Sequence, residues 1–356
     1  MAVGYPLGSQ KDIEDIDILN EDQEGVITYS KALPITLSRI DRNTYPNYSF
    51  LQSDTLTVPY STINITKKAK EDGVKEGIYV AGGRPDQYTH VRAKLDLWGF
   101  PEFVDYLYTI CELGFLEGII PILDVGFLSP NEIRKMAEVC ALIHVFIDSD
   151  QDVTQHLGKL TKAKKRDLRF KQIEWVSKLK TPVSTSILVA KGITKDQYKS
   201  NLEQIAQMHE KYGMIHNVTL HRYTNGIKTL YNKISEPTQK DVLQCIELAK
   251  SILPEDILLN TAIESAEEVP DFIKAGINDL GSLLTGVKSG KSKEAAELEA
   301  GIVTEIEKIG LRLHKRFPLK KAFIKNGQYS KKLGQVFDAY RYKIKKDAQE
   351  KLKESK

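Results

Sequence analysis

The sequence predicts an α/β fold, a (β/α)8 barrel of the TIM type that is either closed or partly open. Three observations lead to this fold class. Eight short apolar runs alternate along the chain with longer segments of helical period. The runs are apolar almost throughout, which is typical of parallel strands covered on both faces. Eight strands that are each followed by a helix are the number that forms a barrel of this type.

Each expected strand is a short apolar run that ends near polar residues. In chain order these runs cover 33–39, 77–83, 118–124, 142–148, 183–191, 217–223, 256–263 and 277–283. The intervening helices have clear start signals: Ser129 and Glu132 form a capping box around Pro130, and similar boxes begin at Thr194 and Thr238. Apolar periodicity predicts further helices over 60–73, 101–113, 164–180, 195–212, 265–275 and 293–310.

A doubly wound open sheet is the alternative architecture. It would carry a glycine-rich dinucleotide turn after an early strand, and the nearest candidate, "AGGR" at 81–84, lacks the G-x-G-x-x-G spacing. The barrel is therefore preferred. We expect a short N-terminal arm over 1–25, the barrel over 26–312 and a C-terminal helical extension over 313–356.

Composition narrows the class of protein. The 356 residues include 51 basic and 48 acidic side chains, so the net charge of +3 predicts no nucleic-acid or membrane partner. Cys111, Cys140 and Cys245 form no C-x-x-C pair or zinc pattern and lie on apolar stripes, which predicts buried, unpaired thiols. No long apolar run or signal peptide is evident, so we expect a cytoplasmic protein.

The binding site of such a barrel lies at the carboxyl ends of its strands. Polar side chains follow almost every expected strand, which predicts a pocket for a small polar ligand with anionic parts. The predicted ligand-binding residues are Arg39, Asp41, Gly82, Gly83, Arg84, Asp148, Ser149, Lys191, Arg222, Tyr223 and Asn260. Asp124 and His221 are the predicted general acid and base. Asp124, Asp148 and His221 could form a facial metal triad, but no histidine spacing supports it, and no metal site is predicted.

Five segments carry a resemblance to a known family. They read "VITYSKALPITLSR", "GVKEGIYVAGGRPDQY", "YTICELGFLEGIIPILDVGFLS", "VSTSILVAKGITKDQYKSNLEQIAQMHEKYG" and "AGINDLGSLLTG". In this order and spacing they resemble the radical S-adenosylmethionine (SAM) enzymes of the deazaflavin (FO) synthase type, especially the small subunit. Biotin synthase is a more distant relative. The similarity covers about residues 25 to 345.

The resemblance implies a C-x-x-x-C-x-x-C motif after the first strand, where three thiolates hold a [4Fe–4S] cluster. In this chain the loop reads "DRNTYPNYSF", and Asp41, Tyr45 and Tyr48 occupy the cysteine positions. We therefore expect no cluster. By the same resemblance, Gly82, Gly83, Asp148 and Ser149 match SAM contacts, whereas Lys191 adds a charge on the adenine side and counts against SAM.

Three functions follow from this interpretation. The first is a cluster-free member of a methanogen cofactor pathway, with the guanylylpyridinol iron cofactor of [Fe]-hydrogenase as the leading candidate. There the cationic side chains would hold anionic groups and Tyr45 or Tyr48 would stack on an aromatic ring. The second is a non-catalytic partner or carrier, for the pathway's proteins or apo-hydrogenase, which docks through the lysine-rich segment 317–334; a solvated face is the alternative for that segment. The third is a SAM-dependent, non-radical methyltransferase.

Overall fold

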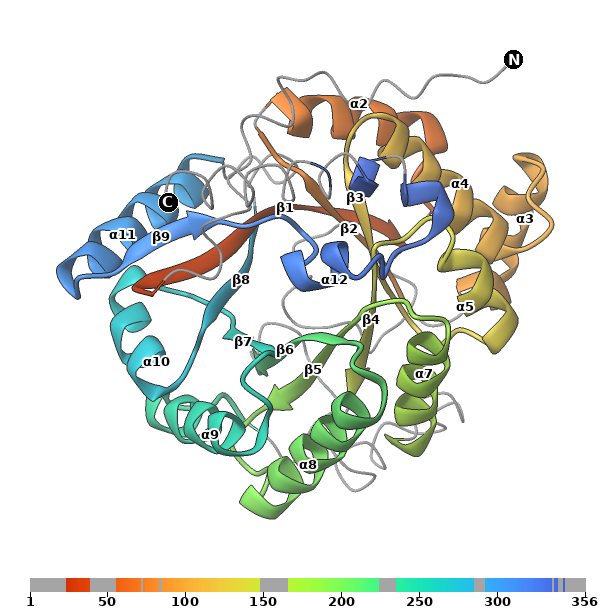
Figure 1. Ribbon diagram of the computed structural model, residues 1–356. Coiled ribbons are helices and arrows are strands. Elements are labelled where there is room, and N and C mark those ends of the chain that lie inside the picture. Colours follow the sequence, from red (N-terminus) through yellow and green to blue (C-terminus); the bar gives the residue numbers. More distant parts are fainter. Residues whose placement is uncertain are drawn as a thin grey trace.

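The chain forms a ring of parallel strands surrounded by helices (Figure 1). The computed structural model describes residues 24–38, 56–71, 73–82, 85–147, 166–223, 235–284, 292–334, 336–338 and 342. The predicted (β/α)8 barrel is confirmed, and it is nearly closed. The rival open sheet with a dinucleotide turn is wrong.

All eight predicted strands are present, and each follows the previous one around the ring. They are β1 (Val26–Ser38), β2 (Glu76–Ala81), β3 (Ile120–Val125), β4 (Leu142–Ile147), β5 (Val183–Val189), β6 (Ile215–Arg222), β7 (Leu258–Thr261) and β8 (Asp279–Leu284). The hydrogen-bonded order is β7-β6-β5-β4-β3-β2-β1-β8, with every pairing parallel. The carboxyl ends of the strands therefore all lie at one mouth of the barrel.

The helices pack outside the ring, as the apolar periodicity predicts. They are α2 (Pro59–Glu71), α3 (Thr89–Leu97), α4 (Phe103–Leu116), α5 (Pro130–Met136), α7 (Arg166–Lys178), α8 (Lys195–Tyr212), α9 (Gln239–Ile252), α10 (Val269–Ala275) and α11 (Ser292–Lys308), whereas α12 (Lys321–Lys325) lies at one end of the ring. The three predicted capping boxes are all formed. In the part of the chain that is described, no helix has the length and apolarity needed to span a bilayer.

The ring is joined differently between its last two strands. No ladder between β7 and β8 is present among the described residues. Instead, the Asn278 side chain accepts from the Leu259 backbone N–H at 2.7 Å and donates to the Ile257 carbonyl at 3.0 Å. The Asn278 backbone N–H also donates to the Leu259 carbonyl at 3.3 Å, so Asn278 joins the two strands through its side chain and its main chain.

The segment after α11 closes the opposite end of the barrel. A short strand that was not predicted, β9 (Arg312–Lys315), pairs parallel with the first residues of β1. The chain then crosses the end of the barrel at which the strands begin, so that α12 covers this end of the ring (Figure 1). Phe317, Phe323 and Phe337 bury their rings against the start of the strands and form a plug.

The plug changes the interpretation of the segment 317–334. Its apolar residues are buried inside the molecule, whereas Lys325 and Lys331 are exposed, so a docking role for this segment stays a prediction. Two of its lysines also have intramolecular partners: Lys320 Nζ contacts the Asp256 carbonyl, and Lys332 Nζ contacts Glu112.

Candidate functional site

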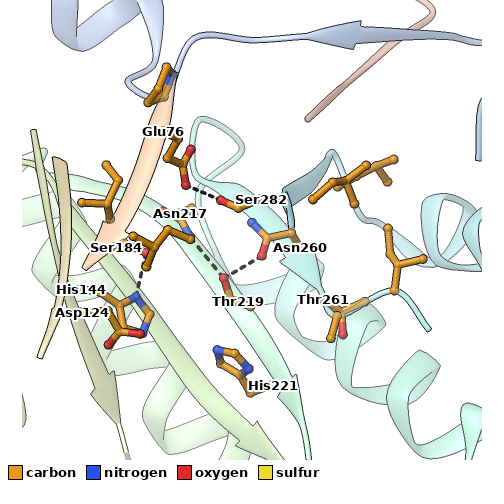
Figure 2. Close-up of a pocket in the computed structure, with 18 of the residues that line it drawn as sticks. Glu76, Asp124, His144, Ser184, Asn217, Thr219, His221, Asn260, Thr261 and Ser282 are labelled. Atoms are coloured by element: carbon orange, nitrogen blue, oxygen red, sulfur yellow. Dashed lines mark hydrogen bonds between the residues drawn. The ribbon is translucent and has the colours of Figure 1, made fainter. Parts of the chain in front are cut away.

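A cavity of about 390 Å³ occupies the interior of the barrel. Its wall consists of inward-facing side chains from β2 to β8 (Figure 2). In most barrels of this class, branched aliphatic side chains fill this space in layers. Here the inward positions of β6 carry Asn217, Thr219 and His221 instead. A hollow, hydrogen-bonding interior of this size is suited to a small ligand.

Two imidazoles form one wall of the cavity. His144 on β4 is held between two serines of β5, with Nδ1 2.9 Å from Ser184 Oγ and Nε2 2.9 Å from Ser186 Oγ. The His221 ring meets it edge-on, with 6.5 Å between the ring centroids. Burial inside the barrel lowers the pKa of each imidazole to about 3, so both rings are neutral at pH 7. The two rings therefore offer hydrogen bonds without a positive charge.

A carboxyl group faces the same wall. Asp124 on β3 lines the cavity and is buried. The register pairs Ile122 with Leu142, so Asp124 and His144 occupy corresponding positions two residues further along neighbouring strands. The predicted acid–base residues Asp124 and His221 therefore both face the interior, and His144 joins them.

The floor of the cavity holds a second buried carboxyl group. Glu76, at the start of β2, accepts hydrogen bonds from the hydroxyls of Ser30 and Ser282, the latter at 2.6 Å. Burial raises the pKa of the Glu76 carboxyl, against the opposing effect of Arg316. The serine donors and this arginine are what allow a carboxyl group to lie at the centre of a barrel.

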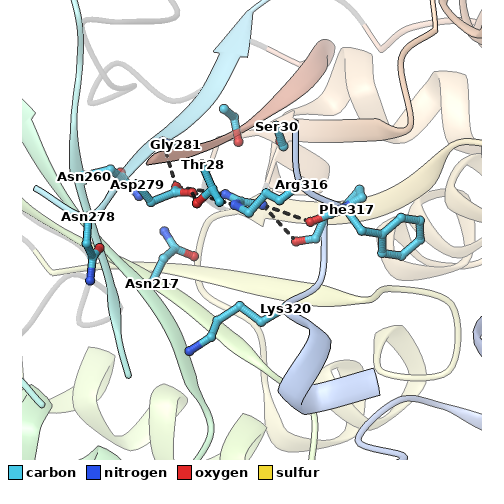
Figure 3. Close-up of polar contacts among 12 residues, drawn as sticks. Thr28, Ser30, Asn217, Asn260, Asn278, Asp279, Gly281, Arg316, Phe317 and Lys320 are labelled. Atoms are coloured by element: carbon cyan, nitrogen blue, oxygen red, sulfur yellow. Dashed lines mark hydrogen bonds and ion pairs between the residues drawn. The ribbon is translucent and has the colours of Figure 1, made fainter. Parts of the chain in front are cut away.

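An ion pair lies beside this carboxyl group. Arg316, in the segment that leads to the plug, binds Asp279 of β8 through two contacts of 2.7 and 3.0 Å (Figure 3). Thr28 of β1 donates a third hydrogen bond, 2.6 Å long, to the same carboxylate. Arg316 Nη1 also donates to the carbonyls of Phe317 and Pro318. The plug is thus fixed to the barrel wall by charge and by hydrogen bonds.

The charges of the cavity do not favour the predicted anionic ligand. Arg316 is the single cation among its described lining residues, and its guanidinium is paired with Asp279. Arg222 does not line the cavity; it is buried and pairs with Glu268 at 2.8 Å and Glu264 at 3.4 Å. A neutral ligand with hydrogen-bonding groups fits this interior better than an anion does.

The remaining predicted ligand-binding residues are divided between the mouth of the barrel and segments that are not described. Asn260 on β7 lines the cavity. Tyr223 is buried against Phe146 and Leu188. Gly82 is buried just after β2, whereas Lys191 is exposed, and its backbone bridges Ser235. Outside the described residues lie Arg39, Asp41, Tyr45, Tyr48, Gly83, Arg84, Asp148 and Ser149.

Several cavity residues were not predicted, because they lie deeper in the barrel than the carboxyl ends of the strands. His144, Asn217 and Thr219 are mid-strand, and Glu76 begins its strand. The available signal was the alternation of polar residues in "NVTLHR", since residues two apart on a strand share one face. Arg316 gave no such signal, because its partner Asp279 is 37 residues away.

The chain is thus a (β/α)8-barrel protein with a polar cavity inside the barrel. Comparison with known proteins shows which barrel proteins it is similar to. No family model matches the chain. It is 26% identical over 316 residues to the 7,8-didemethyl-8-hydroxy-5-deazariboflavin synthase of Archaeoglobus fulgidus, covering 88% of this chain and 97% of the relative. It is 28% identical over 334 residues to the synthase of the same name from Methanocaldococcus jannaschii, covering 91% and 93%.

Solved structures agree on the fold. HydG, a maturase of the [FeFe]-hydrogenase, superposes with a TM-score of 0.65 at 13% identity, covering 93% of this chain and 73% of HydG. Methylornithine synthase (PylB) gives a TM-score of 0.54 at 14% identity, covering 87% and 92%. The predicted resemblance is confirmed: the chain is similar to deazaflavin synthases over most of its length, and it has the fold of the radical SAM enzymes.

The cofactor prediction needs correction. The expectation of no [4Fe–4S] cluster, with SAM only doubtful, is contradicted by the similarity to deazaflavin synthases, HydG and PylB, because enzymes of this class use a cluster and SAM. The prediction relied on missing thiolates in the loop after β1, which lies outside the described residues. Iron–sulfur clusters also accept non-thiolate ligands, so missing cysteines were an insufficient ground.

The described thiols do not form a cluster site themselves. Cys111 on α4 and Cys140, just before β4, are buried with 3.9 Å between their sulfurs, and Cys245 is buried on α9. Burial raises the pKa of Cys111 well above the usual range and that of Cys245 to about 12. Cys111 and Cys245 are therefore protonated, and all three buried thiols are packed outside the ring, away from the cavity.

Proposed function

We propose that this chain is an enzyme of cofactor biosynthesis that binds a neutral, planar heteroaromatic precursor inside its barrel. The observation that carries the proposal is the hollow interior, where hydrogen-bonding side chains replace the usual aliphatic layers. The similarity to two deazariboflavin synthases covers more than nine-tenths of each relative, and it supports a ring of the flavin kind. The lack of an unpaired cation among the described lining residues supports a neutral ligand.

The buried wall supports proton transfer to such a ring. Asp124 is the carboxylate on this wall and the proposed base. His221 is neutral, so it can accept or donate a hydrogen bond at a ring heteroatom. His144 has both ring nitrogens bonded to serines, which suits a residue that positions its neighbours rather than one that exchanges protons.

The narrower prediction, a role in making the guanylylpyridinol cofactor of [Fe]-hydrogenase, stays a prediction. A pyridinol ring is also planar and neutral, which is the property that the cavity selects. Among the described residues, no contact favours the carrier role or the methyl-transfer role, so both also stay predictions.

Ligand titration tests the proposal. We would titrate the protein with 7,8-didemethyl-8-hydroxy-5-deazariboflavin and, separately, with a hydroxypyridine, and follow the heat of binding. Asp124→Asn and His221→Gln should each weaken binding of the true ligand class by about tenfold, since each replaces a carboxyl or imidazole group on the wall by an amide with different donors, acceptors and geometry. His90→Gln, on the exposed face of α3, is the matched control and should bind like the parent.

The outcomes separate the candidates. Binding of the deazariboflavin alone supports a product like that named for the relatives, whereas binding of the hydroxypyridine alone supports the pyridinol pathway. If neither ring binds, or if the cavity variants bind as well as the control, the barrel interior is not the site and the proposal is wrong.

A further inference from the structure

A chain of hydrogen bonds runs along the cavity wall from the plug to β7. The Lys320 backbone N–H lies 3.1 Å from His216 Nε2, and His216 Nδ1 lies 2.9 Å from Asn217 Oδ1. Asn217 Nδ2 is 3.2 Å from Thr219 Oγ1, which is 2.6 Å from Asn260 Oδ1. Figure 2 shows the last two links, with Asn260 at the end of the chain.

A bulge in β6 makes this chain of hydrogen bonds possible. Val183 and Ser184 are neighbours on β5, yet they pair with Ile215 and Asn217, so His216 is an extra residue on β6. A bulge of this kind re-aims side chains. It lets His216 reach the plug while Asn217 still faces the cavity.

The direction of every hydrogen bond in the chain is determined by its first donor. A backbone N–H can only donate, so His216 Nε2 is an acceptor and carries no proton. Burial lowers the pKa of His216 well below 6.5, so the ring is neutral and its one proton lies on Nδ1. That proton goes to the Asn217 oxygen, which leaves the Asn217 NH2 group to donate to Thr219. The Thr219 hydroxyl in turn donates to the oxygen of Asn260.

The chain therefore ends on a fixed donor. Rotation of the Asn260 amide by 180° would break the hydrogen bond that its oxygen accepts from the Thr219 hydroxyl. Asn260 is only 3% exposed, it lines the cavity, and its Nδ2 has no hydrogen-bond partner among the residues that the structure describes. A buried amide group without a protein partner is unfavourable unless a ligand or an ordered water in the cavity supplies the acceptor.

The neighbouring strand keeps this amide in place. Gly281 of β8 has a φ of +70°, and a Cβ at this position would lie 3.1 Å from both Cγ and Oδ1 of Asn260. The Gly281 N–H is held by Asp279 Oδ1 at 2.8 Å, next to the ion pair with Arg316. The amide is thus packed as well as hydrogen-bonded.

We propose that Asn260 determines specificity in this cavity by donating a hydrogen bond to a neutral ring carbonyl oxygen, and that Thr219 and His216 position it. The proposal rests on the proposed function in one respect, that the cavity is the binding site. The acidic groups of the cavity, Glu76 on its floor and Asp124 on its wall, disfavour an anionic acceptor and leave a carbonyl oxygen as the matching group.

A pair of small probes tests the donor directly. 2-Pyridone presents a ring carbonyl, and 2-pyridinethione presents a sulfur that accepts hydrogen bonds weakly. We expect the parent protein to bind 2-pyridone about tenfold more tightly than the thione, which is the effect of one hydrogen bond to a buried donor. Asn260→Leu should abolish this preference, and Thr219→Val should reduce it several-fold while changing a single group on the wall.

The matched control is Asn201→Leu. Asn201 is as buried as Asn260, at 3% exposure, but lies on α8 outside the cavity, where it accepts a hydrogen bond from Arg166. It controls for the loss of one buried hydrogen bond, so it should keep the preference for 2-pyridone. Because the readout is a ratio of two affinities, partial unfolding of a variant does not alter it.

The same titrations with 7,8-didemethyl-8-hydroxy-5-deazariboflavin separate this inference from the proposed function. If binding of 2-pyridone depends on Asn260 and the deazariboflavin does not bind, the donor role stands and the flavin-like ligand class fails. If the deazariboflavin binds the parent and Asn260→Leu equally well, the donor role is overturned while the proposed function stands. If no probe binds the parent, or the thione binds as well as 2-pyridone, the donor role is also overturned.

Discussion

Arg316 and Asp279 form a two-point ion pair at the floor of the barrel, with 2.7 Å from Nε to Oδ2 and 3.0 Å from Nη2 to Oδ1. The side chains are 4% and 0% exposed, so water does not weaken the attraction. The pair joins the plug to β8. Asp279 also accepts a hydrogen bond from the Gly281 N–H, and Gly281 packs against the Asn260 amide. It links the stability of the barrel to the geometry of the cavity.

Breaking this pair on one side should destabilise the fold strongly. Arg316→Met leaves the Asp279 carboxylate buried without its cation, which should lower the free energy of unfolding by about 3–5 kcal/mol. Denaturant titration measures the loss. The double variant Arg316→Met with Asp279→Leu removes both charges and should recover part of it. A single variant within about 0.5 kcal/mol of the parent, the range of neutral surface changes, would show that the pair is not buried as described.

Acid should destabilise the protein through His221. Its folded pKa of about 3 is depressed below the usual 6.5, so the unfolded chain takes up a proton that the folded chain refuses. The contribution is present above pH 6.5 and is lost as the pH falls from 6.5 toward 3. At pH 5 the loss should be about 2 kcal/mol for this group.

Replacement of the imidazole should remove that dependence. In His221→Gln, the fall in unfolding free energy between pH 7 and pH 5 should be smaller than in the parent by that amount, measured by denaturant titration at both pH values. His90→Gln, at an exposed position on α3, serves as the control. Equal pH dependence in all three proteins would mean that His221 is solvated.

Glu76 should make the stability depend on pH in the direction opposite to that of His221. Burial raises the pKa of its carboxyl, so the folded chain holds the proton more tightly than the unfolded chain does. The associated stability is complete below the unfolded pKa of about 4.5 and is lost as the pH rises through the folded value. Glu76→Gln should therefore gain stability relative to the parent as the pH rises above 4.5. A difference that is constant from pH 4 to 8 would contradict this assignment.

A pair of glycine variants isolates the packing against Asn260. Gly281 and Gly213 both have positive φ, +70° and +64°, but a Cβ at Gly213 would meet nothing within 4 Å. Both Gly→Ala changes should cost about 1–2 kcal/mol of stability from backbone strain. Only Gly281→Ala should also impair the preference for 2-pyridone over the thione. Impairment in Gly213→Ala as well would mean that general destabilisation, rather than contact with Asn260, causes it.

The plug should contribute a core-like share of the stability. Phe323 is buried and packs against His216 in a tilted arrangement, with 5.8 Å between the ring centroids. Phe323→Ala should cost about 3–5 kcal/mol of unfolding free energy, as in the core of a domain. Tyr342→Ala, at an exposed position, is the control and should be neutral. A neutral Phe323→Ala would return the segment 317–334 to the surface.

The sequence determined the fold almost completely, because eight apolar runs and their capping boxes are local signals. Asp124, His221 and Asn260 could be found from it for the same reason, since each lies at or near the end of an apolar run. Local patterns were a weaker guide to chemistry: missing cysteines in one loop predicted no cluster, and similarity over most of the chain contradicts that.

Only the tertiary structure decided what lies inside the barrel. The Arg316–Asp279 pair, the plug and the hydrogen bonds from Lys320 to Asn260 join residues that are far apart in the chain. Whether a buried polar side chain is tolerated depends on a partner that closes against it in space, and sequence spacing does not encode that partner. The hydropathy of each strand therefore predicts the barrel, whereas the identity of its interior, hollow and polar rather than filled, follows from how the strands and the plug come together.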